Sequence, residues 1–260
     1  MSQINRFAMT LETLAELAPQ IRAAHADPMP GLPSLKDVLA EYSPLPQSAL
    51  FLGLAEDGLP VLLNLQDPAP GPLLIAGDRG SGKTALLKNI ARAVDHIHSP
   101  IQVEYTVLTG HPVEWEGFDR SANCQGILSF QNRDLIGYIT TLVEWGHKNR
   151  NADQSLLLLL DGFEAMTQFE ELHQQLRWLL MRGPAHNIWP IVTLNAQPGE
   201  GINLWLEAFR TRLFGCIQNE KDVETLTGLR NFSFKDLLAG SQFAMHEGKT
   251  WLPFWIPKPT

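Results

Sequence analysis

Apolar and polar positions predict two helices and a hairpin in the first part of the chain. Residues 7–25 carry apolar side chains at helical spacing, and SLKDVLAEY does the same over a shorter length, with Ser34 placed as its N-cap. The intervening residues 26–34 hold three prolines and a glycine, which is typical of a linker. Residues 51–65 then favour two short strands joined by the turn EDG, which predicts a β-hairpin.

From residue 73 onward, short apolar runs alternate with longer amphipathic segments. The run SLLLLLD is almost wholly apolar, as expected for a strand in the middle of a parallel sheet. This alternation predicts an α/β fold, with a mostly parallel sheet and helices on both faces. Strands are predicted at 73–76, 101–109, 155–161, 187–195 and 210–217, helices within 80–97, 134–149, 168–183 and 233–240, and a closing hairpin over 241–256.

The composition favours one large domain in a reducing compartment. A chain of 260 residues that is 44% hydrophobic suffices for one α/β domain with a small appendage. Cys124 and Cys216 match no metal or redox spacing. The sequence lacks an apolar run of the roughly 18 residues that a membrane span needs, and its start lacks the order of a signal peptide. We therefore expect a cytoplasmic protein without a membrane span.

Residues 77–84 read GDRGSGKT and match the phosphate-loop pattern G-x-x-x-x-G-K-[ST]. The motif lies between a predicted strand and a predicted helix, which is the context that the pattern requires. Its glycines let successive backbone N–H groups point inward at a phosphate, and the helix adds its positive end. Lys83 is expected to reach the β- and γ-phosphates, and the Thr84 hydroxyl to bind Mg²⁺. The predicted nucleotide-binding residues are Gly77, Asp78, Arg79, Gly80, Ser81, Gly82, Lys83, Thr84 and Ala85.

A carboxylate on a neighbouring strand is needed to hold the water shell of the magnesium ion. Asp161 ends the run SLLLLLD and is the candidate for this role. Thr84 and Asp161 are thus the predicted metal-binding pair.

The order of these motifs resembles that of the FtsK/SpoIIIE–HerA branch of P-loop ATPases over roughly residues 50–250. The stretches that carry the resemblance are FLGLAEDGLPVLLNL, GPLLIAGDRGSGKT, LLLLLDGFE, RGPAHNIWPIVTLNAQP and TRLFGCI. It implies a RecA/FtsK-like sheet and ATP with Mg²⁺ as ligands. We expect residues 1–49 to form an N-terminal helical arm and linker, and residues 50–260 to form the ATPase domain.

The resemblance also implies roles for residues outside the loop. Arg182 falls where the family places an arginine that points at the γ-phosphate of a neighbouring subunit, and Lys221 falls near a sensor lysine. Asn195 lies near the end of the strand that carries a polar sensor, and Arg212 belongs to the "TR" pair. An arginine late in an amphipathic helix is more commonly a solvated charge, so both readings of Arg182 stay open.

Hydrolysing members of this group carry a glutamate directly after the strand-end aspartate, and this chain has Gly162 there. Because glycine cannot accept a proton, either Glu164 replaces that base or hydrolysis is slow. Phosphate loops of this form with a changed acidic motif resemble the ATPase modules of EccC, the type VII secretion ATPase of the same family.

Three functions are compatible with these motifs. The first is a nucleotide-gated module in protein interaction or secretion, acting in a homo-oligomer or a ring with related subunits. The second is a DNA-translocating ring ATPase, which the net charge of −8 disfavours because DNA-binding proteins normally present a basic face. The third is a kinase, which the FtsK-like sequence after residue 182 disfavours.

Overall fold

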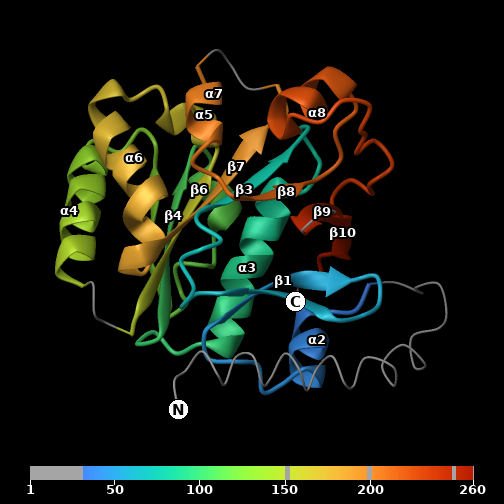
Figure 1. Ribbon diagram of the computed structural model, residues 1–260. Helices are drawn as coiled ribbons and strands as arrows, with labels where there is room; N and C mark the ends of the chain where they lie inside the picture. Colours follow the sequence, from blue (N-terminus) through green and yellow to red (C-terminus); the bar gives the residue numbers. More distant parts are fainter. Residues whose placement is uncertain (1–31, 150–152, 198–200, 248–249, 260) are drawn as a thin grey trace.

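The computed structural model describes residues 32–149, 153–197, 201–247 and 250–259, and their strands form one sheet. The predicted helix over 7–25 lies outside the described residues. The sheet has ten strands in the order β2-β1-β10-β9-β8-β3-β7-β6-β4-β5. Figure 1 shows its central strands with helices packed around them. One part of the sheet is parallel, as the alternating strand and helix patterns predict, and the other part is antiparallel, as the hairpin patterns predict.

The parallel half contains every strand predicted between residues 73 and 217 and one further strand. Since the strands are parallel, their carboxyl ends meet at one edge of the sheet, where ligands bind in open α/β folds. The strands are β3 (Leu73–Gly77), β4 (Val103–Thr109), β5 (Cys124–Ser129), β6 (Ser155–Asp161), β7 (Ile188–Asn195) and β8 (Thr211–Phe214).

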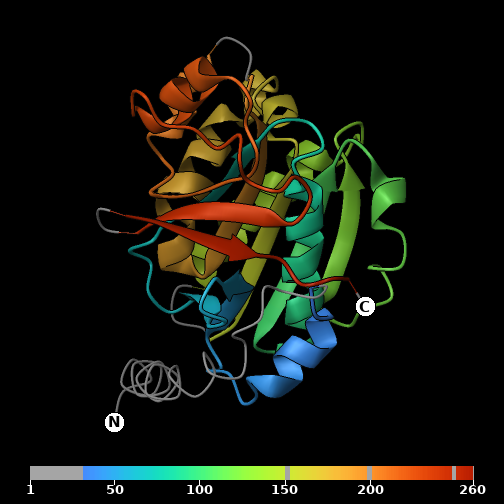
Figure 2. The same cartoon turned by 90° about the vertical axis from the view of Figure 1, so that its right-hand side faces the viewer.

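The antiparallel half is made of two hairpins, both predicted. The first joins β1 (Ala49–Ala55) to β2 (Pro60–Asn64), and the second joins β9 (Gln242–Glu247) to β10 (Thr250–Trp255). The second hairpin, red in Figure 2, connects the two halves because β9 pairs with β8 and β10 pairs with β1. It thereby extends the sheet beyond the predicted parallel core.

Helices cover both faces of the sheet (Figure 1). On one face α3 (Lys83–Ile97) packs on Leu157 and Leu159 of β6, and α2 (Leu35–Glu41) packs against α3 and β1. On the other face α4 (Leu135–Lys148) and α6 (His173–Arg182) cover the alternate leucines of β6. The predicted N-cap of α2 is confirmed, since the Ser34 side chain accepts a hydrogen bond from the Asp37 N–H.

Shorter elements complete the described chain. They are α5 (Phe163–Met166), α7 (Asn203–Leu206), α8 (Glu220–Thr227), and the 3-10 helices η1 (Pro112–Trp115), η2 (Glu170–Leu172) and η3 (Gly183–His186). Within the described ranges, every helix is too short or too polar to cross a bilayer.

The predicted helix over 233–240 is wrong. This segment forms a series of turns, and distant groups hold both of its ends. The Phe234 ring stacks on Phe214 of β8, with ring centroids 4.8 Å apart. The Gly240 N–H donates to the carbonyl of Ser81 in the phosphate loop (3.0 Å). Tertiary contacts thus override the local helical preference.

Candidate functional site

The loop between β3 and α3 has the conformation that its glycines predict. Gly80 and Gly82 have φ values of +79° and +97°, in the left-handed region that favours glycine. A Cβ atom on Gly82 would lie 2.7 Å from the Cα of Gly240, so a side chain does not fit there. Helix α3 begins at Lys83, as predicted, and its amino end faces the mouth of the loop.

The side chain of Lys83 folds back over this loop. Its Nζ donates to the carbonyl oxygens of Gly77 (2.9 Å) and Asp78 (2.7 Å). Burial lowers the pKa of the Lys83 ammonium from its ordinary value, and the carboxylates of Glu164 and Asp161 oppose that shift. The Lys83 ammonium is therefore held at the phosphate loop by two backbone carbonyl oxygens, which places a positive charge where the motif predicts a phosphate.

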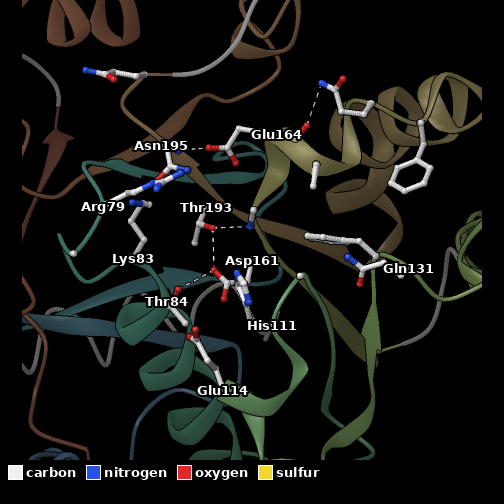
Figure 3. A pocket seen from close by; sticks show the side chains of 18 residues that line it. Arg79, Lys83, Thr84, His111, Glu114, Gln131, Asp161, Glu164, Thr193 and Asn195 are labelled. Carbon is white, nitrogen blue, oxygen red and sulfur yellow. Dashed lines mark hydrogen bonds between the residues drawn. The ribbon is translucent and has the colours of Figure 1, made fainter.

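Asp161 ends β6 and accepts hydrogen bonds from three elements. The hydroxyl of Thr84, at the start of α3, donates to its Oδ1 (2.9 Å), and so does the hydroxyl of Thr193 in β7 (3.1 Å). The indole N–H of Trp115, in η1, donates to Oδ2 (3.3 Å). Figure 3 shows Thr84, Asp161 and Thr193 converging at the mouth of the loop. The two predicted metal-binding residues are thus in direct contact.

Gly162 and Glu164 follow Asp161 in a sharp change of direction. Gly162 has a φ of +110°, and its N–H donates to the Thr193 hydroxyl (2.8 Å). Helix α5 then begins at Phe163, which places Glu164 in its first turn. The Glu164 carboxylate faces the end of β7, where it accepts a hydrogen bond from the Asn195 N–H (Figure 3). The Glu164 carboxylate therefore lies at the same end of the sheet as the phosphate loop and Lys83, and both side chains line one cavity.

These groups surround a cavity of about 1030 Å³ at the carboxyl edge of the parallel strands. Its wall contains groups that were not predicted, from the segments that follow β4, β5 and β6 and from within β7. The lining includes Arg79, Gly80, Lys83, Thr84, Gly110, His111, Glu114, Phe130, Gln131, Asp161, Gly162, Glu164, Ala165, Gln168, Phe169, Thr193, Asn195 and Gln197. The cavity has a cationic floor at the loop and two additional carboxylates, Glu114 and Glu164, on its walls.

The donor set fits a hard divalent cation shared with a ligand. Among the residues that the structure describes, no group of three His, Cys, Asp or Glu side chains is placed to hold a metal by itself. One hydroxyl and one carboxylate are available at Thr84 and Asp161. Mg²⁺ is commonly bound in this way, through one or two protein oxygens together with phosphate oxygens and water.

A second cavity, of about 430 Å³, lies on the other side of Arg79. Asp78 fixes its floor, because its N–H donates to the Cys216 carbonyl (3.0 Å) and its Oδ2 accepts from the Gln218 N–H (2.8 Å). Arg79 and Asn195 line both cavities. The segment after β8 is thereby attached to the phosphate loop.

Three other candidate residues lie outside the main cavity. Arg182 is exposed at the end of α6 and is followed by η3, which leads into the amino end of β7, at the sheet edge opposite the loop. Lys221 is exposed in the first turn of α8. Arg212 contacts backbone instead, because its guanidinium donates to three carbonyls, at distances of 3.0, 2.6 and 2.6 Å. Burial lowers the pKa of Arg212.

The strand order, the glycine loop and the strand-end aspartate together define the fold of a P-loop ATPase module of the FtsK/SpoIIIE type. Neither the family models nor the curated proteins compared with this sequence match it. The predicted resemblance is confirmed by similarity to solved structures at the level of the fold.

The structure is similar to the cytoplasmic domain of the Thermomonospora curvata type VII secretion ATPase EccC. The TM-score is 0.72 at 15% identity, over 87% of this chain and 32% of that chain. It is also similar to Thermomonospora curvata EccC ATPases 2 and 3 in complex with a signal sequence peptide. There the TM-score is 0.69 at 16% identity, over 90% of this chain and 44% of that chain. A third similar structure is that of the pCW3 conjugation coupling protein TcpA with ATPγS. Its TM-score is 0.66 at 14% identity, over 88% of this chain and 70% of that chain. This chain spans between 32% and 48% of the EccC and EssC structures that it matches.

Proposed function

We propose that this chain binds ATP with Mg²⁺ and acts as a slow or assembly-dependent ATPase module that gates a protein interaction. The observation that supports this most directly is the contact between Thr84 and Asp161 at the mouth of a glycine loop whose carbonyl oxygens hold the Lys83 ammonium. ATP is favoured because the structure shares its fold with TcpA, which was solved with ATPγS.

Each residue of the loop has a role in this proposal. The backbone N–H groups of residues 78–84 and the Lys83 ammonium bind the β- and γ-phosphates. Thr84 would contribute its hydroxyl to the metal, and Asp161 would hold the metal's water shell. A bound Mg²⁺ would neutralise charge on the phosphates. Because the Thr84 hydroxyl already donates to Asp161 Oδ1 at 2.9 Å, these two side chains need little rearrangement.

Slow hydrolysis is supported by the position of the acidic side chains. Gly162 cannot act as a base, and the Glu164 carboxylate is engaged by the Asn195 N–H. Glu164 remains our candidate for the base that activates water, and Glu114 is a second carboxylate in the same cavity. Losing a general base typically lowers a rate by about 10²–10⁴-fold.

Assembly and partners follow from the resemblance. Arg182 lies at the opposite edge of the sheet from its own phosphate loop, which favours a role toward a neighbouring subunit in a homo-oligomer or ring. Lys221 is the proposed sensor of the same assembly. EccC ATPases 2 and 3 bind a signal sequence peptide, so we propose a protein partner for this chain too. We retain residues 50–260 as the ATPase domain, residues 1–49 as its arm, and a cytoplasmic location.

A DNA-translocating motor is the alternative, favoured by the similarity to a conjugation coupling protein. Calorimetry and turnover measurements separate the possibilities. We expect wild-type protein to bind MgATP, Lys83→Ala to lose that binding, and turnover to be slow with and without DNA. Turnover that DNA stimulates strongly would support the motor instead. Absence of ATP binding by folded wild-type protein would refute the proposal as a whole.

A further inference from the structure

Trp115 connects the predicted metal site to a part of the chain that no motif identified. It ends η1, its side chain is 0% exposed, and its indole N–H donates to Asp161 Oδ2 at 3.3 Å. We propose that Trp115 is a positioning residue, which fixes the Asp161 carboxylate so that Oδ1 stays beside Thr84. It thereby sets how strongly a divalent metal ion adds to nucleotide binding. This inference rests on the proposed MgATP site.

The hydrogen bonds on Asp161 explain why this contact matters. Both hydroxyl donors, from Thr84 and Thr193, approach Oδ1, so they leave Oδ2 to the indole alone among the contacts of the described residues. The terminal torsion of an aspartate is soft, and bonds to one oxygen restrain it weakly. A donor on the second oxygen removes that freedom. The carboxylate is then presented to a metal in one orientation.

The indole ring itself is held from two sides. Its partner in the same segment is Phe118, at a centroid distance of 5.1 Å in an edge-on arrangement. From α3, the Lys88 Nζ lies 5.7 Å from the Trp115 ring centroid, and the Arg92 guanidinium lies 3.9 Å from that of Phe118. Since α3 also carries Thr84, the ring joins the phosphate-loop helix to the end of β6. A residue held this firmly can impose an orientation on its partner.

Burial alone does not account for the contact. Buried tryptophans usually find a hydrogen-bond partner for their N–H, so a purely structural role for Trp115 is the competing explanation. However, Trp189 packs in the same apolar cluster at 1% exposure, and its Nε1 lacks a partner within the described residues. The fold therefore accommodates a buried indole without a partner. Trp189 also provides a matched control.

The test compares Trp115→Phe with Trp189→Phe, because both changes keep an aromatic ring and remove one indole N–H. ATPγS affinity is measured for each variant with Mg²⁺ and with EDTA. We expect Trp115→Phe to lose about 10-fold of the affinity gained from Mg²⁺, the scale typical of residues that orient metal ligands. Affinity in EDTA should be unchanged, and Trp189→Phe should behave like wild type. An unchanged Mg²⁺ gain in folded Trp115→Phe would overturn the inference.

A spectroscopic arm uses the full chain without nucleotide or metal. The indole ¹H–¹⁵N resonance of Trp115 is assigned by its loss in Trp115→Phe, or by selective labelling if that variant does not fold. Asp161→Asn should shift this resonance and leave that of Trp189 in place. A resonance that does not respond to Asp161→Asn would show that the contact is absent and would overturn the inference. Wild-type protein that binds no ATPγS would refute only the proposed function, since the resonance would still report the contact.

Discussion

Gly162 stands where the resemblance to hydrolysing P-loop ATPases predicts a glutamate, and its backbone gives a quantitative prediction. At a φ of +110°, a residue with a Cβ is strained by about 1–3 kcal/mol. Replacing glycine also restricts the unfolded chain, which returns about 0.4–1 kcal/mol. A Cβ on Gly162 would lie 3.4 Å from Cε2 of the buried Phe130, so this contact does not offset the backbone strain. We therefore expect Gly162→Ala to lower the free energy of unfolding by about 1–2 kcal/mol.

Gly137 provides the control, because it lies inside α4 and a Cβ there would meet nothing within 4 Å. Gly137→Ala should raise the free energy of unfolding by about 0.5–1 kcal/mol, the usual gain in a helix. Urea denaturation of both variants measures the difference. If Gly162→Ala is as stable as Gly137→Ala, the left-handed conformation at Gly162 is not a constraint and the reasoning fails.

The same backbone strain affects a glutamate introduced at position 162. Gly162→Glu carries the backbone cost of Gly162→Ala, and we expect it to leave the ATP turnover rate within a few-fold of wild type. A single-turnover assay at saturating MgATP measures this rate for both proteins. An increase of 10²-fold or more, the range of a working general base, would show that the backbone adapts to the glutamate.

Three further predictions concern other residues. Glu164→Gln should lower ATP turnover by about 10²-fold or more if Glu164 is the base, whereas a larger loss in Glu114→Gln would assign that role to Glu114. Arg212→Met should lower the free energy of unfolding by about 2–3 kcal/mol in urea, because carbonyls at the ends of α7 and α8 lose their donor, while ATP affinity is unchanged. Burial raises the pKa of all three tyrosines, that of Tyr42 from 10.0 to about 12. The part of the stability that depends on their neutral form is therefore complete below pH 10 and is lost as the pH rises toward 12. Absorbance at 295 nm should show phenolate near pH 10.5 in urea but not in the native protein.

The parts of the site that could be predicted are those encoded by local pattern. The phosphate loop carries its own spacing, and the run before Asp161 is unmistakably a strand. Parallel strands bring Thr84 and Asp161 to the same edge, so their contact follows from the pattern as well. Helix α8 was missed although Asn219 caps it, with Glu220 and Asp222 in its first turn. That signal was present in the sequence.

The remaining part depends on tertiary contacts that no spacing encodes. Trp115 lies 46 residues from Asp161, in a segment with neither helical nor strand periodicity. Thr193 lies inside an apolar strand, where a threonine is unremarkable until its neighbour is known. The failed helix over 233–240 has the same cause, since Gly240 is held by the phosphate loop. Contacts between residues far apart in the sequence thus determine both the geometry of the site and the absence of the helix predicted over 233–240.

The loss of the usual glutamate and the turn at Gly162 are parts of one backbone arrangement. The left-handed glycine directs its N–H to Thr193, whose hydroxyl donates to Asp161, so the turn helps to orient the carboxylate of the proposed metal site. The same turn starts α5 immediately at Phe163 and brings Glu164 to the Asn195 N–H. A side chain at position 162 would disturb the support of Asp161 as well as the position of Glu164. If the proposed function holds, this arrangement favours a stable nucleotide site over rapid hydrolysis, and we predict that fast turnover requires a new path for residues 162–164 rather than one substitution.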